Sequence, residues 1–168
     1  HSLVRKVGAD CPALLKGVQR EPAWPAGWTG SISHTTGICM VALAATDRYA
    51  SLGLDVEQAT PLNPELVDLI CRKEEQASLR DLRQEIGAHP ALEKLVFSAK
   101  ESVHKTYFPL NQHTLDFLDA RIDLDWGRQA FTAFILNPEP HPRQPIRQLQ
   151  GRFHFHQDWV VTCIANPA

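Results

Sequence analysis

Apolar and polar residues alternate in several short runs of the chain, and this two-residue period predicts β-strands. In the middle of the chain, apolar residues recur three and four positions apart, which predicts helices. We expect strands over residues 30–34, 38–44, 51–56, 117–124, 130–136, 148–155 and 159–165. We expect helices over residues 3–7, from 64 with a restart near 73 through 82, and 91–107.

Proline and glycine mark the breaks between these elements. Residues 21–28 are rich in proline and are expected to form an ordered loop, and Pro109 is expected to end the second long helix. Two segments, 30–44 and 151–165, share one pattern: a strand led by glycine, a polar turn, and an apolar strand that ends in alanine. This internal similarity fits a fold made of two related halves.

The composition narrows the class of protein. A chain of 168 residues with 43% hydrophobic and 21% charged residues is typical of one globular domain or two small lobes. The net charge of −2 gives no global basic field, so the composition does not support binding to nucleic acid. No apolar run reaches the roughly 18–20 residues of a membrane span, and no secretory signal opens the chain. The four cysteines form no CxxC pair, which favours a reducing cytoplasm.

Two carboxylates follow one another on a single strand face. Asp55 and Glu57 point the same way because side chains alternate along a strand, while Leu54 and Val56 point to the core. Two neighbouring carboxylates repel unless a cation neutralises them, and Mg²⁺ prefers such oxygen ligands. A solvated strand edge is the alternative, although the apolar neighbours favour a central strand.

A second candidate pair lies on the helix expected over residues 91–107. Glu101 and Lys105 are four residues apart and share one helix face, with Phe97 and Phe108 on either side. A surface ion pair worth roughly 0.3–0.5 kcal/mol is one interpretation. The other is a partly buried face on which Glu101 completes a metal site, while Lys100 and Lys105 offset phosphate charge.

Histidine and serine residues add weaker candidates. Ser33 and His34 end a short strand at a polar turn, where they could donate hydrogen bonds to a phosphate. His154 and His156 share a strand face, but no third soft ligand accompanies them, so we interpret them as polar surface residues. His104 lies on the helix of Glu101 without an assigned role.

Four motifs occur in order along most of the chain: Pro-x-Trp-Pro from Pro22, Gly-Ser-Ile-Ser-His from Gly30, Gly-Leu-Asp-Val-Glu from Gly53, and Phe-Ser-x-Lys-Glu-Ser-x-x-Lys from Phe97. Together they resemble the 4'-phosphopantetheinyl transferases of the surfactin and enterobactin type. The last motif resembles the branch common in bacterial siderophore biosynthesis. The resemblance implies transfer of the 4'-phosphopantetheine arm of coenzyme A to a serine of an acyl or peptidyl carrier protein, with release of adenosine 3',5'-bisphosphate.

The resemblance also implies a fold and a set of site residues. The implied fold is α+β and pseudo-twofold, with two lobes that each pack a small antiparallel sheet on a long helix, in a single-chain, monomeric pseudo-dimer. Residues 1–57 would be the remainder of the first lobe and 58–168 the second, because the family has several dozen more residues before the position of His1. The implied roles are as follows: Asp55, Glu57 and Glu101 hold Mg²⁺; Glu101 and Lys105 are catalytic; Arg20, Ser33, His34, Lys100 and Lys105 contact coenzyme A.

Two other functions use the same residues. A Mg²⁺-dependent hydrolase of nucleotide pyrophosphates would cleave coenzyme A with water alone. A non-catalytic module would bind coenzyme A or a carrier protein without forming product.

Overall fold

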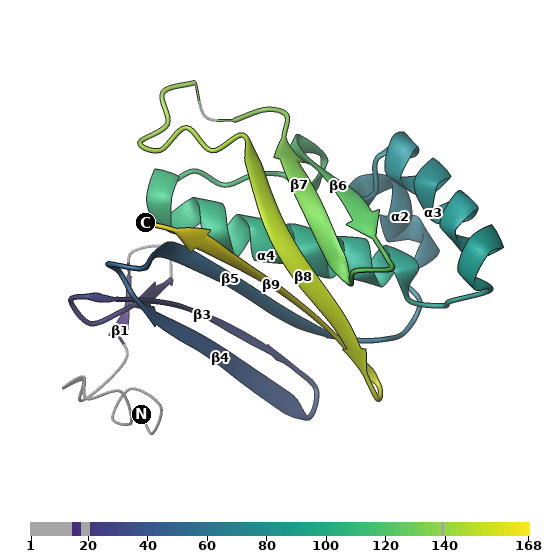
Figure 1. Cartoon of the computed structure of the whole chain (residues 1–168), viewed down its shortest axis with the longest axis horizontal. Coiled ribbons are helices and arrows are strands. Elements are labelled where there is room, and N and C mark those ends of the chain that lie inside the picture. Colours follow the sequence, from purple (N-terminus) through teal and green to yellow (C-terminus); the bar gives the residue numbers. More distant parts are fainter. Residues whose placement is uncertain (1–14, 18–20, 139) are drawn as a thin grey trace.

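The computed structural model describes residues 15–17, 21–138 and 140–168, and Figure 1 shows their arrangement. The helix expected over residues 3–7 and the candidate Arg20 lie outside the described residues. A five-stranded antiparallel sheet with the order β5-β9-β8-β7-β6 forms the largest layer. Its strands are β5 (Tyr49–Gln58), β6 (Ala120–Asp125), β7 (Ala130–Ile135), β8 (Gln148–His156) and β9 (Trp159–Pro167).

One long helix, α4 (Leu92–Asn111), crosses one face of this sheet (Figure 1). Apolar side chains alternate along β6, β7, β8 and β9, and the inward residue of each pair is buried against the helix. The helix contributes Leu92, Leu95 and Tyr107 to the centre of this core, all with no exposed surface. The two-residue period of the strands and the helical period of α4 therefore place apolar side chains on the two facing surfaces, and these side chains pack in one layer.

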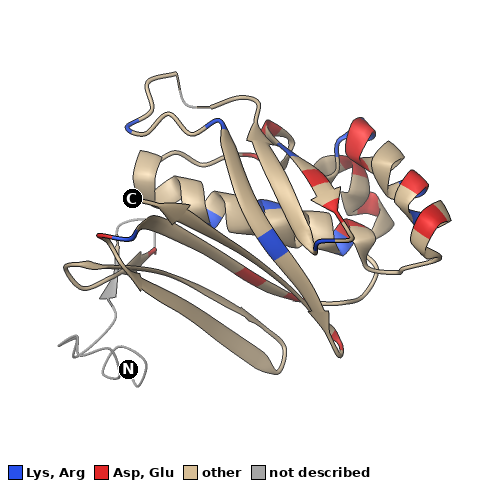
Figure 2. Cartoon of the chain, in the orientation of Figure 1, with Lys and Arg blue, Asp and Glu red and all other residues tan. Residues whose placement is uncertain are grey.

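A hairpin of β3 (Trp28–Thr35) and β4 (Ile38–Ala45) contacts β5 beyond the edge of the large sheet. The hydroxyl of Ser31 accepts a hydrogen bond of 3.0 Å from the amide of Leu54, which joins the hairpin to β5. The hairpin carries no Lys, Arg, Asp or Glu (Figure 2), and no residue of β4 is buried. Two short strands, β1 (Leu15–Lys16) and β2 (Pro22–Ala23), pair with each other.

Two further helices, α2 (Pro64–Ile70) and α3 (Lys73–Ile86), lie at one end of the molecule (Figure 1). The predicted start of α2 is confirmed, since the Asn63 side chain accepts a hydrogen bond of 3.1 Å from the Glu65 amide and Pro64 opens the helix. The predicted restart near residue 73 is also confirmed. Acidic side chains concentrate on α2, α3 and β6 (Figure 2).

Two expected boundaries were wrong. Pro109 does not end α4, which continues to Asn111 and closes with Gln112 in the left-handed conformation. Proline removes one backbone donor and disfavours the interior of a helix, but here it falls in the last turn. Residues Phe117–Asp119 form a short 3₁₀ turn, η1, so that strand β6 begins only at Ala120.

The predicted α+β class with small antiparallel sheets and a long helix is confirmed. The pseudo-twofold relation of two lobes stays a prediction. Within the described residues, no helix is both long and apolar enough to cross a membrane.

Candidate functional site

The centre of the candidate site is the buried carboxylate of Asp55, which is only 2% exposed. The Ser33 hydroxyl donates a hydrogen bond of 2.8 Å to Asp55 Oδ1, and Lys105 Nζ donates one of 2.7 Å to the same oxygen. Lys105 also lies 3.2 Å from the Ser33 hydroxyl, so the three side chains contact one another. Three elements, β3, β5 and α4, thus supply one residue each.

A close approach of α4 to β5 sets the position of these groups. A Cβ atom on Gly53 would overlap the carbonyl oxygen of Ser102 and the hydroxyl of Thr106 and would lie 2.9 Å from the carbonyl carbon of Ser102. Only glycine permits this contact, two residues before Asp55 on the strand and one residue after Glu101 on the helix.

Hydroxyl groups join α4 to β9 beside Asp55. Thr162 lies opposite Asp55 in the pairing of β5 with β9. Its hydroxyl contacts the hydroxyls of Ser98 at 2.9 Å and Ser102 at 2.6 Å, and all three residues are fully buried. The relative position of Glu101 and the β5 carboxylates is therefore fixed by the packing of one face of α4 on two neighbouring strands, β5 and β9.

The two remaining carboxylates have perturbed acidities. Burial raises the pKa of Glu101, the Lys105 ammonium opposes the increase, and the charges of Asp55 and Glu57 add to it. Burial also raises the pKa of Glu57, with a further increase from Asp55 and opposing effects of Lys94 and Lys105. The three predicted metal ligands are thus close enough to influence one another electrostatically.

The acidic residues do not form a complete metal site by themselves. Among residues 15–17, 21–138 and 140–168, no three His, Cys, Asp or Glu side chains gather closely enough to hold an ion. The second carboxylate oxygen of Asp55, Oδ2, is nevertheless buried without a hydrogen-bond partner in the described part of the chain. Mg²⁺ commonly takes one or two carboxylates and completes its shell with water and substrate phosphates. The carboxylates of this site therefore fit a magnesium ion whose remaining ligands are water and substrate phosphates.

A cavity of about 590 Å³ opens beside Lys105. Its wall includes residues of the proline-rich segment, of β3 and of α4, among them Trp24, Ser31, His104 and Phe108. A second cavity of about 320 Å³ adjoins Glu101 and also includes His104. Burial lowers the pKa of His104 and Lys105 lowers it further, while the imidazole stacks on Phe108 at 5.6 Å between ring centroids.

Two predicted coenzyme A contacts are not brought to this cluster. His34 is exposed at the end of β3, opposite Cys39 in the hairpin, and within the described residues no hydrogen bond or ion pair joins it to Asp55 or Lys105. Lys100 is 3% exposed, and its ammonium donates to Glu75, to the Ile70 carbonyl and to the Phe117 carbonyl.

The structure gives the Lys100 ammonium partners inside the protein, and its contact with coenzyme A stays a prediction. An ammonium group has three donors, and all three are satisfied inside the protein on a different face of α4 from Lys105. Burial lowers the pKa of Lys100, and the charge of Glu75 opposes this decrease. Lys100 and Glu101 follow one another on the helix and both border the cavity of about 320 Å³, but the Lys100 ammonium is held by its own protein partners.

One contributor was missed by reasoning from the sequence. Lys94 affects the pKa of Glu57, and its ammonium lies 5.7 Å from the centre of the Phe97 ring. The sequence signal was present, because Lys94 precedes Glu101 by seven residues and so occupies the same face of the helix.

The sequence matches two family models. Residues 1–44 match the 4'-phosphopantetheinyl transferase N-terminal domain, and residues 51–164 match the 4'-phosphopantetheinyl transferase superfamily. The chain belongs to the 4'-phosphopantetheinyl transferase superfamily, which is a family of enzymes.

Individual relatives agree with this assignment. The chain is 35% identical to the 4'-phosphopantetheinyl transferase Svp of Streptomyces mobaraensis over 165 residues, covering 95% of this chain and 65% of that protein. It is 28% identical to the transferase PptT of Mycobacterium tuberculosis, covering 95% of this chain and 71% of that protein. It is 37% identical to enterobactin synthase component D of Salmonella typhimurium, covering 64% of this chain and 43% of that protein. The resemblance drawn from the motifs is confirmed, and the chain spans only part of the length of these relatives.

Proposed function

We propose that this chain transfers the 4'-phosphopantetheine arm of coenzyme A to a serine hydroxyl of an acyl or peptidyl carrier protein and releases adenosine 3',5'-bisphosphate. The observation that carries the proposal is the buried Asp55 carboxylate in a member of this enzyme family: one oxygen is paired with Lys105, and the other has no hydrogen-bond partner among the residues that the structure describes. A buried carboxylate with an unsatisfied oxygen is costly unless a ligand completes it.

Asp55, Glu57 and Glu101 are the residues that would hold Mg²⁺. A bound magnesium ion would neutralise pyrophosphate charge as the transferred phosphorus is attacked. The raised pKa values of Glu57 and Glu101 reflect burial together with like charges, the condition that a divalent cation relieves.

Glu101 is our candidate for the general base. The serine oxygen forms a bond to the phosphorus that carries the pantetheine, the serine proton passes to Glu101, and the bond from that phosphorus to the oxygen of the adenosine 5'-phosphate breaks. A carboxylate whose pKa is raised accepts a proton more readily than an ordinary one. Lys105, a quarter exposed, would stabilise the negative charge on the departing bisphosphate.

Ser33 supports this arrangement from β3, because its hydroxyl donates to Asp55 and accepts a hydrogen bond of 3.2 Å from the Val56 amide. We also retain as proposals the contact of Arg20 and His34 with coenzyme A and the monomeric state. Cys39, Cys71 and Cys163 are free thiols, which supports the proposed location in a reducing cytoplasm.

The test is the intact mass of an apo carrier protein after incubation with this chain, coenzyme A and Mg²⁺. Glu101→Gln removes the proposed base and one metal ligand, whereas Glu85→Gln alters an exposed carboxylate on α3 as a matched control. We expect a gain of one phosphopantetheine with the parent chain and with Glu85→Gln. Glu101→Gln should lower the rate on the order of a hundredfold or more.

Other outcomes identify the alternatives. Cleavage of coenzyme A without a change in carrier mass would replace the transferase proposal with a pyrophosphate hydrolase. Coenzyme A binding with neither cleavage nor transfer would leave a non-catalytic binding module.

A further inference from the structure

A buried ion pair beside the site is not used by the proposed transfer chemistry. Lys100 Nζ lies 2.8 Å from Glu75 Oε2, and the two side chains are 2% and 1% exposed. Removing two charges from water costs free energy that their attraction often does not recover, so such a pair is weak evidence for stability alone. The contacts of the pair support another role, which is to fix the positions of neighbouring segments of the chain.

The pair joins five segments of the chain. Lys100 on α4 donates to the Ile70 carbonyl at the end of α2 at 2.8 Å and to the Phe117 carbonyl in η1 at 2.9 Å. Glu75 on α3 accepts a hydrogen bond of 2.7 Å from the Ile122 amide on β6. Every donor of the Lys100 ammonium is satisfied, and both oxygens of the Glu75 carboxylate accept hydrogen bonds. The network therefore fixes the positions of the segments that it joins relative to one another.

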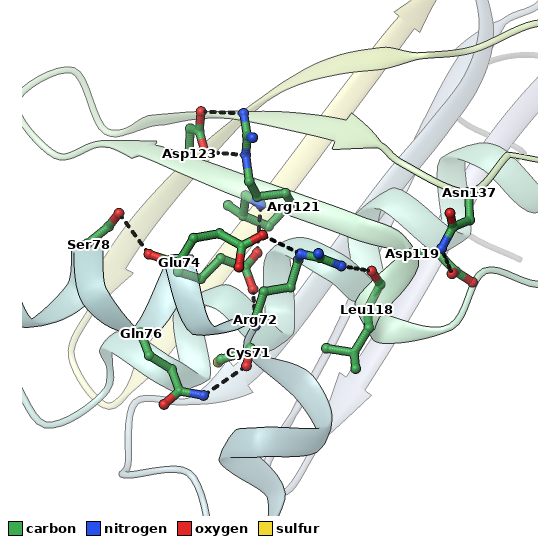
Figure 3. A network of polar contacts seen from close by, with 12 residues as sticks. Cys71, Arg72, Glu74, Gln76, Ser78, Leu118, Asp119, Arg121, Asp123 and Asn137 are labelled. Atoms are coloured by element: carbon green, nitrogen blue, oxygen red, sulfur yellow. Dashed lines mark hydrogen bonds and ion pairs between the residues drawn. The ribbon is translucent and has the colours of Figure 1, made fainter.

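A second cation reinforces the hold on η1. Figure 3 shows Arg72, at the start of α3, donating to the Leu118 carbonyl. Glu75 also accepts a hydrogen bond of 2.6 Å from the Arg72 backbone amide, so the same carboxylate binds Lys100 and the backbone of Arg72, while the Arg72 guanidinium pairs with Glu74. The carbonyls of two consecutive residues, Phe117 and Leu118, are thus bound by residues of two helices.

The segment that these contacts hold is one wall of the cavity beside Glu101. Thr114, Leu115, Asp116 and Phe117 line that cavity of about 320 Å³ opposite α4, from which Glu101 comes. We infer that Glu75 and Lys100 are positioning residues: they fasten residues 114–119 to α4 and so set the space around Glu101. This inference rests on the proposed transfer function for its catalytic consequence.

The experiment uses the double variant Glu75→Gln with Lys100→Met, which removes both charges and keeps similar volumes. A neutral replacement of a buried pair commonly preserves stability, whereas removal of one partner does not. Arg128→Met serves as the control, because it breaks an ion pair with Asp125 whose side chains are 83% and 46% exposed and which makes no contact with Glu75 or Lys100 among the described hydrogen bonds and ion pairs. Amide hydrogen exchange of residues 114–119, kcat and the KM for coenzyme A are measured for each chain.

We expect the double variant to remain folded, with exchange over residues 114–119 accelerated about tenfold or more. We expect its kcat to fall about tenfold or more through misplacement of the wall around Glu101, with little change in KM for coenzyme A. Arg128→Met should change none of these quantities. A purely structural role would alter the unfolding temperature without separating kcat from KM.

Unchanged exchange in the folded double variant, or faster exchange with unchanged kcat, overturns the inference. If the double variant does not fold, Lys100→Arg takes its place, since a planar guanidinium keeps the charge but cannot sit among three acceptors as an ammonium does. If the parent chain transfers nothing to a carrier, the proposed function fails. The exchange measurement then decides by itself whether Lys100 holds the segment.

Discussion

The contact between Gly53 and α4 gives the sharpest test of how the site is held. In Gly53→Ala, the gap between the new methyl carbon and the carbonyl carbon of Ser102 must open from 2.9 Å to roughly 3.5 Å or more. The carbonyl oxygen of Ser102 lies nearer still, within overlap of the new methyl group, and it is helix backbone, so α4 must move away from β5 by about one ångström or more. Asp55 and Glu101, which flank this contact on the two elements, would then separate.

The expected cost follows from overpacking of a filled core. We expect Gly53→Ala to lower the free energy of unfolding by about 1–3 kcal/mol. For a chain of this size, that corresponds to a decrease in Tm of roughly 2–12 °C. Carrier loading should slow by roughly ten- to a hundredfold, because catalysis is sensitive to displacements of this size.

Urea unfolding and a carrier-loading assay measure the two effects. Gly127→Ala is the matched control, since a methyl group there would meet only Asp125 Oδ1 at 3.8 Å, an ordinary contact. If Gly53→Ala matched the parent chain in both stability and loading rate, the argument that this contact sets the distance between β5 and α4 would be refuted.

Three further outcomes can be measured on the same chain. Ser33→Ala should lower the free energy of unfolding by about 1–3 kcal/mol in urea, because Asp55 and the Val56 amide both lose a buried partner; an unchanged midpoint would contradict this. The raised pKa of Glu101 means that the folded state binds its proton more tightly than the unfolded state. The stability that this adds is complete below the unfolded value of 4.5 and is lost as pH rises through the raised value. Relative to the parent chain, Glu101→Gln should therefore become progressively more stable over that interval in urea unfolding at a series of pH values, and a constant difference would show that the pKa is not raised. Added Mg²⁺ should raise Tm in the parent chain but not in Asp55→Asn, and equal shifts in both would place the ion elsewhere.

Most of the fold could be predicted because its strands and helices follow simple periods. The alternation along residues 148–155 and 159–165 gave the last hairpin, and Asn63 with Pro64 gave the start of α2. The end of α4 could not be predicted from Pro109, since proline in a final turn costs less than proline in an interior one.

The site was predictable where spacing alone decides which side chains share a face. Asp55 with Glu57, and Glu101 with Lys105, follow from the strand and helix periods. Lys100 shows the limit of such reasoning, because its place in the motif says nothing about which long-range partner it meets. Glu75 is 25 residues away, and only the tertiary structure brings its carboxylate to the ammonium.

The order of strands in the large sheet has a consequence for the assembly of the site during folding. Strand β5, which carries Asp55 and Glu57, enters that sheet only through β9, and Asp55 pairs with Thr162. More than a hundred residues separate these partners, so their pairing closes one of the longest loops in the domain and is expected to be slow. On the ribosome, α4 and β5 can emerge and collapse early, yet the carboxylates gain their final support only after the last strand has left the exit tunnel. The candidate site is therefore completed only when β9 has been synthesised and has paired with β5.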